Sequence, residues 1–105
     1  MNVQDKINIL YNNCKNLLSY EFDNRIEIKN VDEAYLIQDS FINLKKKNGF
    51  GEIGGWKVAL TNPEMQKLVG VNNPVEGAIL NSLIYKNNVS LKLENYCHLG
   101  AEAEI

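Results

Sequence analysis

Two stretches in the first half of the chain place apolar residues at intervals of three and four. In residues 5–20 the apolar positions are Ile7, Leu10, Tyr11, Cys14, Leu17 and Leu18. In residues 31–48 they are Ala34, Ile37, Phe41 and Leu44. This spacing gathers apolar side chains on one side of a helix. We therefore predict two amphipathic helices, at 5–20 and 31–48.

The second of these helices carries signals at both ends. Asn30 followed by Glu33 is typical of a capping box at a helix N-terminus, and Gly49 is a typical stop. The lysines at 45–47 lie in the last turn, where cations complement the helix dipole. Between the two helices, "EFDNRIEI" has turn-forming residues and no helical period. We expect a connection there, with a short extended piece at 26–28.

The period of the apolar residues changes to two after "GFGEIGG". In "WKVAL", Trp56, Val58 and Leu60 share one side of an extended strand, and Lys57 and Ala59 share the other. We expect the side with the large apolar residues to lie on a core. Lys57 then sits in mid-strand beside small residues.

The remaining residues alternate turns with extended runs. Asn62 is a predicted cap, Pro63 and Glu64 suit a first helical turn, and Gly70 ends this short helix. "NNPVEGAIL" predicts a turn that leads into an extended run, residues 87–88 predict another turn, and "GAEAEI" predicts the start of a last strand. Because helices precede strands, we predict an α+β fold.

Composition narrows the classes of function. The chain has 105 residues, 45% of them hydrophobic and 23% charged, with a net charge of -2. This charge would not attract nucleic acid. No run approaches the roughly 18 apolar residues of a membrane span, and the first residues resemble no secretory leader. We expect a cytoplasmic protein with no membrane association, in which Cys14 and Cys97 are reduced thiols.

The two glutamates of "GAEAEI" are candidate metal ligands. In a strand, Glu102 and Glu104 would project from one face, roughly 6.5 to 7 Å apart. Carboxylate oxygens suit Mg²⁺ or Mn²⁺. The alternative is that they form the solvated side of an edge strand. For Lys57 the alternative to a functional role is a lysine whose amine reaches water. His98 and Cys97, as neighbours in a strand, would face opposite ways and form no pair.

Four stretches occur together and in order: "VDEAYLIQDSF", "GGWKVALTNPEMQKLVGV", "PVEGAIL" and "AEAEI". This combination resembles the 2-oxopent-4-enoate hydratase and 4-oxalocrotonate decarboxylase group of the fumarylacetoacetate hydrolase superfamily. The likeness extends from about residue 3 to 105 and includes the family motif G-x-K-[IV]-[GA]-L-T. It implies the first part of a mixed β fold, with an N-terminal helical segment at 1–50 and the start of a catalytic, β-rich domain at 51–105.

The resemblance also implies roles for single residues. Lys57 matches the active-site lysine that lies beside the substrate's 2-oxo carboxylate. Glu102 and Glu104 match the first two of three acidic ligands to Mg²⁺ or Mn²⁺, and the third ligand would lie beyond the C-terminus. Glu76 and Thr61 are candidates for substrate binding. Glu76 is one position away from the family's acidic residue, so a solvated turn glutamate is the alternative, and helix capping is the alternative for Thr61.

The implied activity is addition of water to a 2-hydroxy-2,4-dienoate or 2-oxo-4-enoate in the catabolism of aromatic compounds, or decarboxylation of a related 2-oxo acid. Full-length relatives commonly assemble, so a homo-oligomer is expected. One alternative is a carbon-carbon hydrolase of the same superfamily. Such hydrolases use a histidine ahead of the lysine, and "KKKNGFGEIGG" has none. Another alternative is a non-catalytic truncated fragment. The 105-residue chain alone is expected to be inactive.

Overall fold

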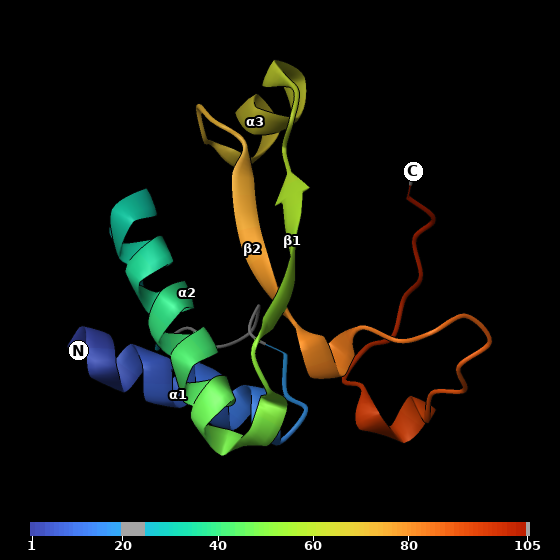
Figure 1. The fold of residues 1–105 in the computed structure, drawn as a ribbon. Coiled ribbons are helices and arrows are strands. Elements are labelled where there is room, and N and C mark those ends of the chain that lie inside the picture. Colours follow the sequence, from blue (N-terminus) through green and yellow to red (C-terminus); the bar gives the residue numbers. More distant parts are fainter. Residues whose placement is uncertain (20–24, 105) are drawn as a thin grey trace. The chain divides into compact units, whose positions relative to one another are not determined.

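The computed structural model describes residues 1–19 and 25–104. Its main elements, in chain order, are α1 (Val3–Lys15), α2 (Val31–Lys45), β1 (Ile53–Ala59), α3 (Pro63–Val69) and β2 (Val75–Leu80) (Figure 1). Short helical turns of other types are Lys46–Phe50 (π) and Asn81–Leu83 and Leu93–Asn95 (3₁₀). Two helices precede an antiparallel sheet of two strands, so the predicted α+β class is confirmed.

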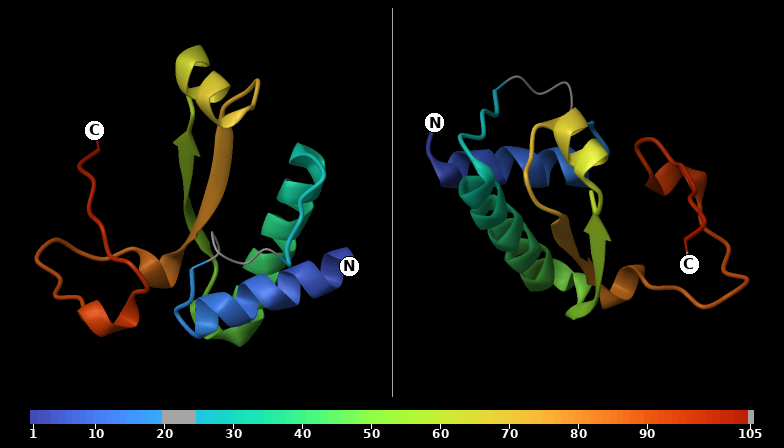
Figure 2. Two further views of the ribbon diagram at one scale, coloured as in Figure 1. Left: turned by 180° about the vertical axis from the view of Figure 1, so that it is seen from behind. Right: turned by 90° about the horizontal axis from the view of Figure 1, so that it is seen from above.

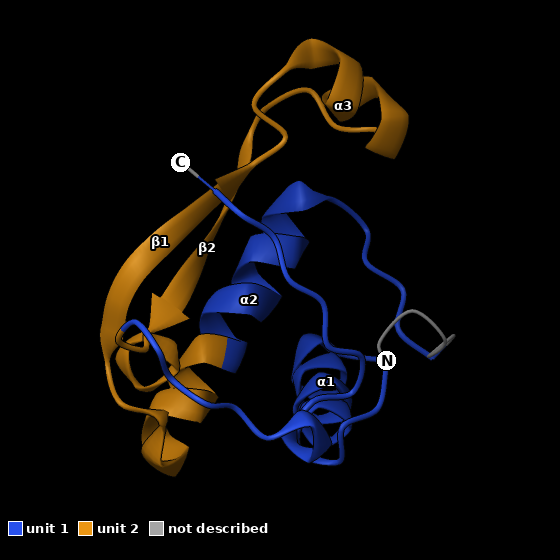
Figure 3. Ribbon diagram, turned by 90° about the vertical axis from the view of Figure 1, so that its right-hand side faces the viewer, with its two compact units in different colours: residues 1–41, 87–105 blue, residues 42–86 orange. Residues whose placement is uncertain are grey.

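The chain divides into two compact units (Figure 3). The first unit comprises residues 1–41 and 87–105, and the second comprises residues 42–86. The first therefore contains α1, most of α2 and the C-terminal segment, while the second contains β1, α3 and β2. The family resemblance implied a different division, into a helical segment at 1–50 and a β-rich domain that starts at 51, and this stays a prediction.

Helix α1 is shorter than predicted, because the chain leaves the helix at Asn16. The prediction of a helix at 5–20 was wrong at both ends, since α1 begins at Val3 and ends at Lys15. Leu17 has a positive φ of 56°. Its N–H donates to the carbonyl of Cys14 at 3.2 Å, and the N–H of Leu18 donates to that of Asn13 at 2.8 Å. These two bonds form a Schellman turn, which satisfies the last carbonyls of a helix.

The predicted start of α2 is confirmed. The side-chain oxygen of Asn30 accepts the N–H of Glu33 at 2.8 Å, and the Glu33 carboxylate accepts the N–H of Lys29 at 2.6 Å. At the other end α2 stops at Lys45, three residues before the predicted end, and Gly49 follows with a φ of 90°. The extended piece expected at 26–28 is not a strand in the structure.

Contacts between α1 and α2 form the core of the first unit. Ile7 and Ile37 are each 3% exposed, and the rings of Tyr11 and Phe41 meet edge to face at 6.3 Å between centroids. These positions belong to the two apolar stripes of the sequence. Amphipathic helices bury such stripes against each other, which removes apolar surface from water.

The second unit is a hairpin whose connection contains α3. Strands β1 and β2 pair antiparallel, and α3 lies at the end of the ribbon where β1 ends and β2 begins (Figure 2). As predicted, the side chain of Asn62 caps α3 by accepting the N–H of Met65 at 2.8 Å, Pro63 is the first helical residue, and Gly70 ends the helix with a φ of 80°. Local capping signals therefore position the return of the chain into β2.

The apolar side of β1 is exposed, so its predicted burial was wrong. Trp56 is 61% exposed and Val58 is 57% exposed. A two-stranded ribbon buries little by itself, because each face needs another element packed on it. The buried apolar side chain among the described residues of this unit is Leu80, at the end of β2.

The C-terminal segment is irregular. Residues 100–104 form no strand, so the predicted strand in "GAEAEI" was wrong over the part that the structure describes. Alanine and glutamate are poor strand formers, and an extended run becomes a strand only when another strand pairs with it. In the described part of the chain, no helix has both the length and the apolar character needed to cross a membrane.

Candidate functional site

Lys57 lies in the middle of β1, between two small residues of its own strand. Its direct partner across the ladder is Gly77. Gly55 and Ala59 are on the same side of β1, because alternate residues of a strand share a face. Cross-strand partners also share a face, so Gly77 adds no side chain to this side. The predicted setting of Lys57, a mid-strand cation beside small residues, is therefore present in the hairpin.

The two predicted substrate-binding residues occupy other positions in the same unit. Glu76 pairs with Val58, one rung from the pair of Lys57 and Gly77. Neighbouring rungs face opposite sides of a ribbon, so the backbone directs Glu76 and Lys57 to different faces. Thr61 is exposed and lies in the short link between β1 and α3. The hairpin therefore does not gather these three residues on one face.

Glu102 and Glu104 lie in the irregular C-terminal segment and are exposed. They belong to the first unit, whereas Lys57 belongs to the second. Their carboxylate oxygens are suitable donors for Mg²⁺ or Mn²⁺, which take about six oxygen ligands. Among the residues that the structure describes, no three or more histidine, cysteine, aspartate or glutamate side chains cluster to hold a metal ion. The described residues therefore do not complete a metal site, and metal binding stays a prediction.

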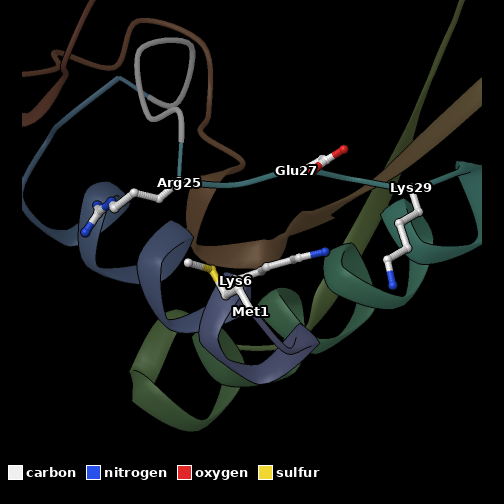
Figure 4. A pocket seen from close by; sticks show the side chains of 5 residues that line it. All are labelled: Met1, Lys6, Arg25, Glu27 and Lys29. Carbon is white, nitrogen blue, oxygen red and sulfur yellow. The ribbon is translucent and has the colours of Figure 1, made fainter.

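A pocket of about 340 Å³ in the first unit has a cationic lining (Figure 4). It is lined by Met1, Lys6, Arg25, Glu27 and Lys29. Figure 4 shows the guanidinium of Arg25 pointing away from the ammonium of Lys6. Lys6 is also engaged by Glu33 at 2.9 Å. Since these cations do not converge and one is neutralised, the pocket lacks the geometry of a compact anion site.

The ion pair between Lys6 and Glu33 is nearly buried and joins α1 to the start of α2. The side chains are 5% and 12% exposed. The pKa of Glu33 is lowered from its ordinary value of 4.5, first by the hydrogen bond from the backbone N–H of Lys29 and then by the hydrogen bond from Lys6. Both donors favour the charged carboxylate. The arrangement is structural, since it holds together the two helices of the first unit.

A second pocket, of about 360 Å³, brings together residues that are far apart in the sequence. Cys14, from α1, and Cys97 and His98, from the C-terminal segment, are among its lining residues. Both cysteines are free, as predicted. Cys97 and His98 were expected as neighbours in a strand, and that strand was wrong, because the chain bends at these two residues. No spacing motif links Cys14 to Cys97, so only the tertiary structure could reveal this pocket.

Comparisons with known proteins place these features in context. The fold is α+β, with the candidate lysine on its hairpin. The chain is 38% identical over 72 residues to the 2-keto-4-pentenoate hydratase of Burkholderia vietnamiensis (strain G4 / LMG 22486). It is 36% identical over 72 residues to the 2-keto-4-pentenoate hydratase of Paraburkholderia phymatum (strain DSM 17167 / CIP 108236 / LMG 21445 / STM815).

The similarity is partial on both sides. Each alignment covers 69% of this chain and 27% of the relative, so the chain matches about a quarter of each hydratase. A continuous span of 72 residues in a chain of 105 must include positions 34–72, and therefore β1 with Lys57. No family model matches the chain. No solved structure matches it.

Proposed function

We propose that this chain is part of a hydratase that adds water to a 2-oxo-4-enoate or its 2-hydroxydienoate form. The observation that carries the proposal is the similarity to two proteins named 2-keto-4-pentenoate hydratase, over a span that includes β1. The setting of Lys57 supports the proposal, because its direct partner Gly77 adds no side chain beside the cation. Val75 and Ile79 flank that position on the same face. Decarboxylation of a related 2-oxo acid is the neighbouring activity.

Lys57 has two chemical roles open to it in this reaction. As an ammonium, it would hold the substrate carboxylate by a charge-assisted hydrogen bond. As a general acid or base, it would transfer a proton while the dienol becomes the conjugated ketone, before water adds. Both roles require its Nζ to reach the substrate past Gly55, which has no side chain, and past the small side chain of Ala59; both residues share its face of the ribbon.

We further propose that Glu102 and Glu104 supply two ligands to Mg²⁺ or Mn²⁺, with another ligand from outside the residues described. A bound divalent ion would supply a Lewis acid for the enolate oxygen. As the described residues leave that site incomplete, the roles of this chain's groups are limited to carboxylate donation by the glutamates and substrate contact by Lys57. We propose that the whole enzyme is a homo-oligomer.

A chimeric enzyme tests the proposed function. The matching span of the Burkholderia hydratase would be replaced by that of this chain, and hydration of 2-keto-4-pentenoate would be followed by the loss of ultraviolet absorbance. We expect an active chimera. Lys57→Ala should lower the activity of the chimera at least about 100-fold, which is the size of a typical contribution from general acid-base catalysis. The matched control is Lys67→Ala, because Lys67 lies in the exposed last turn of α3.

Different outcomes distinguish the proposal from its alternatives. A folded, inactive chimera would count against the hydratase function and favour a non-catalytic segment. Cleavage of a carbon-carbon bond in a diketo acid would instead favour the hydrolase reading. If Lys57→Ala and Lys67→Ala had equal activity, Lys57 would lose its assigned role even though the chimera was active.

A further inference from the structure

Two thiols from opposite ends of the chain line one pocket of the first unit. Cys14 lies in the last turn of α1 and is partly exposed, while Cys97 lies in the bend that follows the turn Leu93–Asn95 and is exposed. Both are free thiols on the wall of the same pocket, whose volume is about 360 Å³. Small reagents in solution can therefore reach a pocket whose wall contains both cysteines.

His98 gives this pocket a group that can accept a proton from a thiol. A neutral imidazole has a ring nitrogen that accepts a proton. The thiolate, and not the thiol, is the nucleophile in exchange with a disulfide. The other titratable side chain on the wall is Tyr96, and no carboxylate or cation is among the described lining residues. A histidine beside Cys97 is thus the base nearest in sequence to the more exposed thiol.

We propose that Cys14 and Cys97 form a redox-active dithiol, which a small-molecule disulfide converts into an intramolecular disulfide. Cys97 loses its proton to His98, and its thiolate attacks the reagent, forming a mixed disulfide and releasing one reagent thiolate. Cys14 then gives its proton to the first released reagent thiolate, and its own thiolate attacks the Cys97 sulfur of the mixed disulfide. This attack releases the second reagent thiolate, which takes the proton held by His98. Two protein thiols are oxidised, and one reagent disulfide is reduced to two thiols.

The backbone on the two sides of the pocket suits this order of events. Cys14 is held by α1 and by the Schellman turn, in which its carbonyl accepts the N–H of Leu17. Cys97 belongs to residues 96–104, which form neither helix nor strand. A disulfide needs Cα atoms roughly 4.4 to 6.8 Å apart. The backbone around Cys97 can move to meet this requirement, because such a movement breaks no hydrogen bonds of a helix or sheet.

The test uses the 105-residue chain and oxidised glutathione. Free thiols would be titrated with time, and the products would be mapped by mass spectrometry of non-reduced peptides. We expect both thiols to disappear together, with Cys14 and Cys97 peptides linked within one chain and no glutathione retained. Cys14→Ser should trap glutathione on Cys97, because the second attack is then impossible.

Two results would overturn the dithiol proposal. One is wild-type chain that carries glutathione separately on each cysteine, and the other is linkage between chains in place of linkage within one chain. The role of His98 has its own measurement, the dependence of the first step on pH. His98→Gln should slow that step and flatten its dependence on pH, and an unchanged pH profile would refute this role while the pairing of thiols stood.

Discussion

Gly51 lies just ahead of the lysine-bearing strand, where its substitution should be severe for two separate reasons. Its φ of 85° and ψ of -151° fall in a region that essentially only glycine occupies. A Cβ there would also overlap the side-chain oxygen of Asn81 and lie 3.1 Å from its Cγ. That oxygen accepts the N–H of Glu52 at 3.2 Å, so Asn81 cannot turn aside without losing this bond.

The size of the effect follows from these two terms. The backbone conformation should cost Gly51→Ala roughly 1–3 kcal/mol, and the overlap should add about 1–3 kcal/mol, as in other overpacked sites. Gly49→Ala is a matched control, since Gly49 also has a positive φ, of 90°, but a Cβ there would meet nothing within 4 Å. The control should lose only about 1–2 kcal/mol.

Urea unfolding followed by far-ultraviolet circular dichroism measures both variants. We expect the free energy of unfolding of Gly51→Ala to fall below that of Gly49→Ala by at least about 1 kcal/mol, the lower end of the overlap cost. Adding Asn81→Ala should reduce the gap, because the overlapping side chain is then absent. Equal losses for the two glycine variants would refute the steric argument.

Three further predictions concern stability. Leu80→Ala should lower the free energy of unfolding by about 2–5 kcal/mol, because Leu80 is only 2% exposed. Leu68 is 78% exposed, so Leu68→Ala should change it by less than about 0.5 kcal/mol. Chemical denaturation of the two variants measures this difference. Asn62→Ala should cost about 1 kcal/mol and speed hydrogen exchange at Met65, whose N–H it caps; unchanged exchange would contradict this. The pKa of Glu33 is below 4.5, so its contribution is complete above pH 4.5 and is lost as the pH falls through the folded-state pKa. Glu33→Gln should lose less stability over that acid range, as measured by thermal melting against pH, and identical acid profiles would count against it.

Local signals in the sequence predicted the elements best. Asn30 and Asn62 cap helices as expected, and Gly49 and Gly70 end helical paths with positive φ. Such signals succeed because they depend on neighbouring backbone groups. The end of α1 was missed because Leu17, a residue that rarely adopts a positive φ, occupies the position where glycine is usual.

The candidate site was predicted unevenly for a related reason. Lys57 has the mid-strand setting that alternation in "WKVAL" indicated, since its pairing with Gly77 involves nearby strands of one hairpin. Glu102 and Glu104 were expected on a strand, but they lie in an irregular segment. The alternation of residues shows which side chains would share a face if the segment were a strand. It does not show whether another strand pairs with the segment, and without such pairing no strand forms.

By itself, then, the sequence determined the α+β order, the caps of α2 and α3, and the small-residue setting of Lys57, all of which depend on interactions within a helix or between adjacent strands. The tertiary structure alone decided that Trp56 is exposed and that Cys14 shares a pocket with Cys97 and His98. Burial and the meeting of distant segments depend on which surfaces pack together, and no local pattern of residues encodes that.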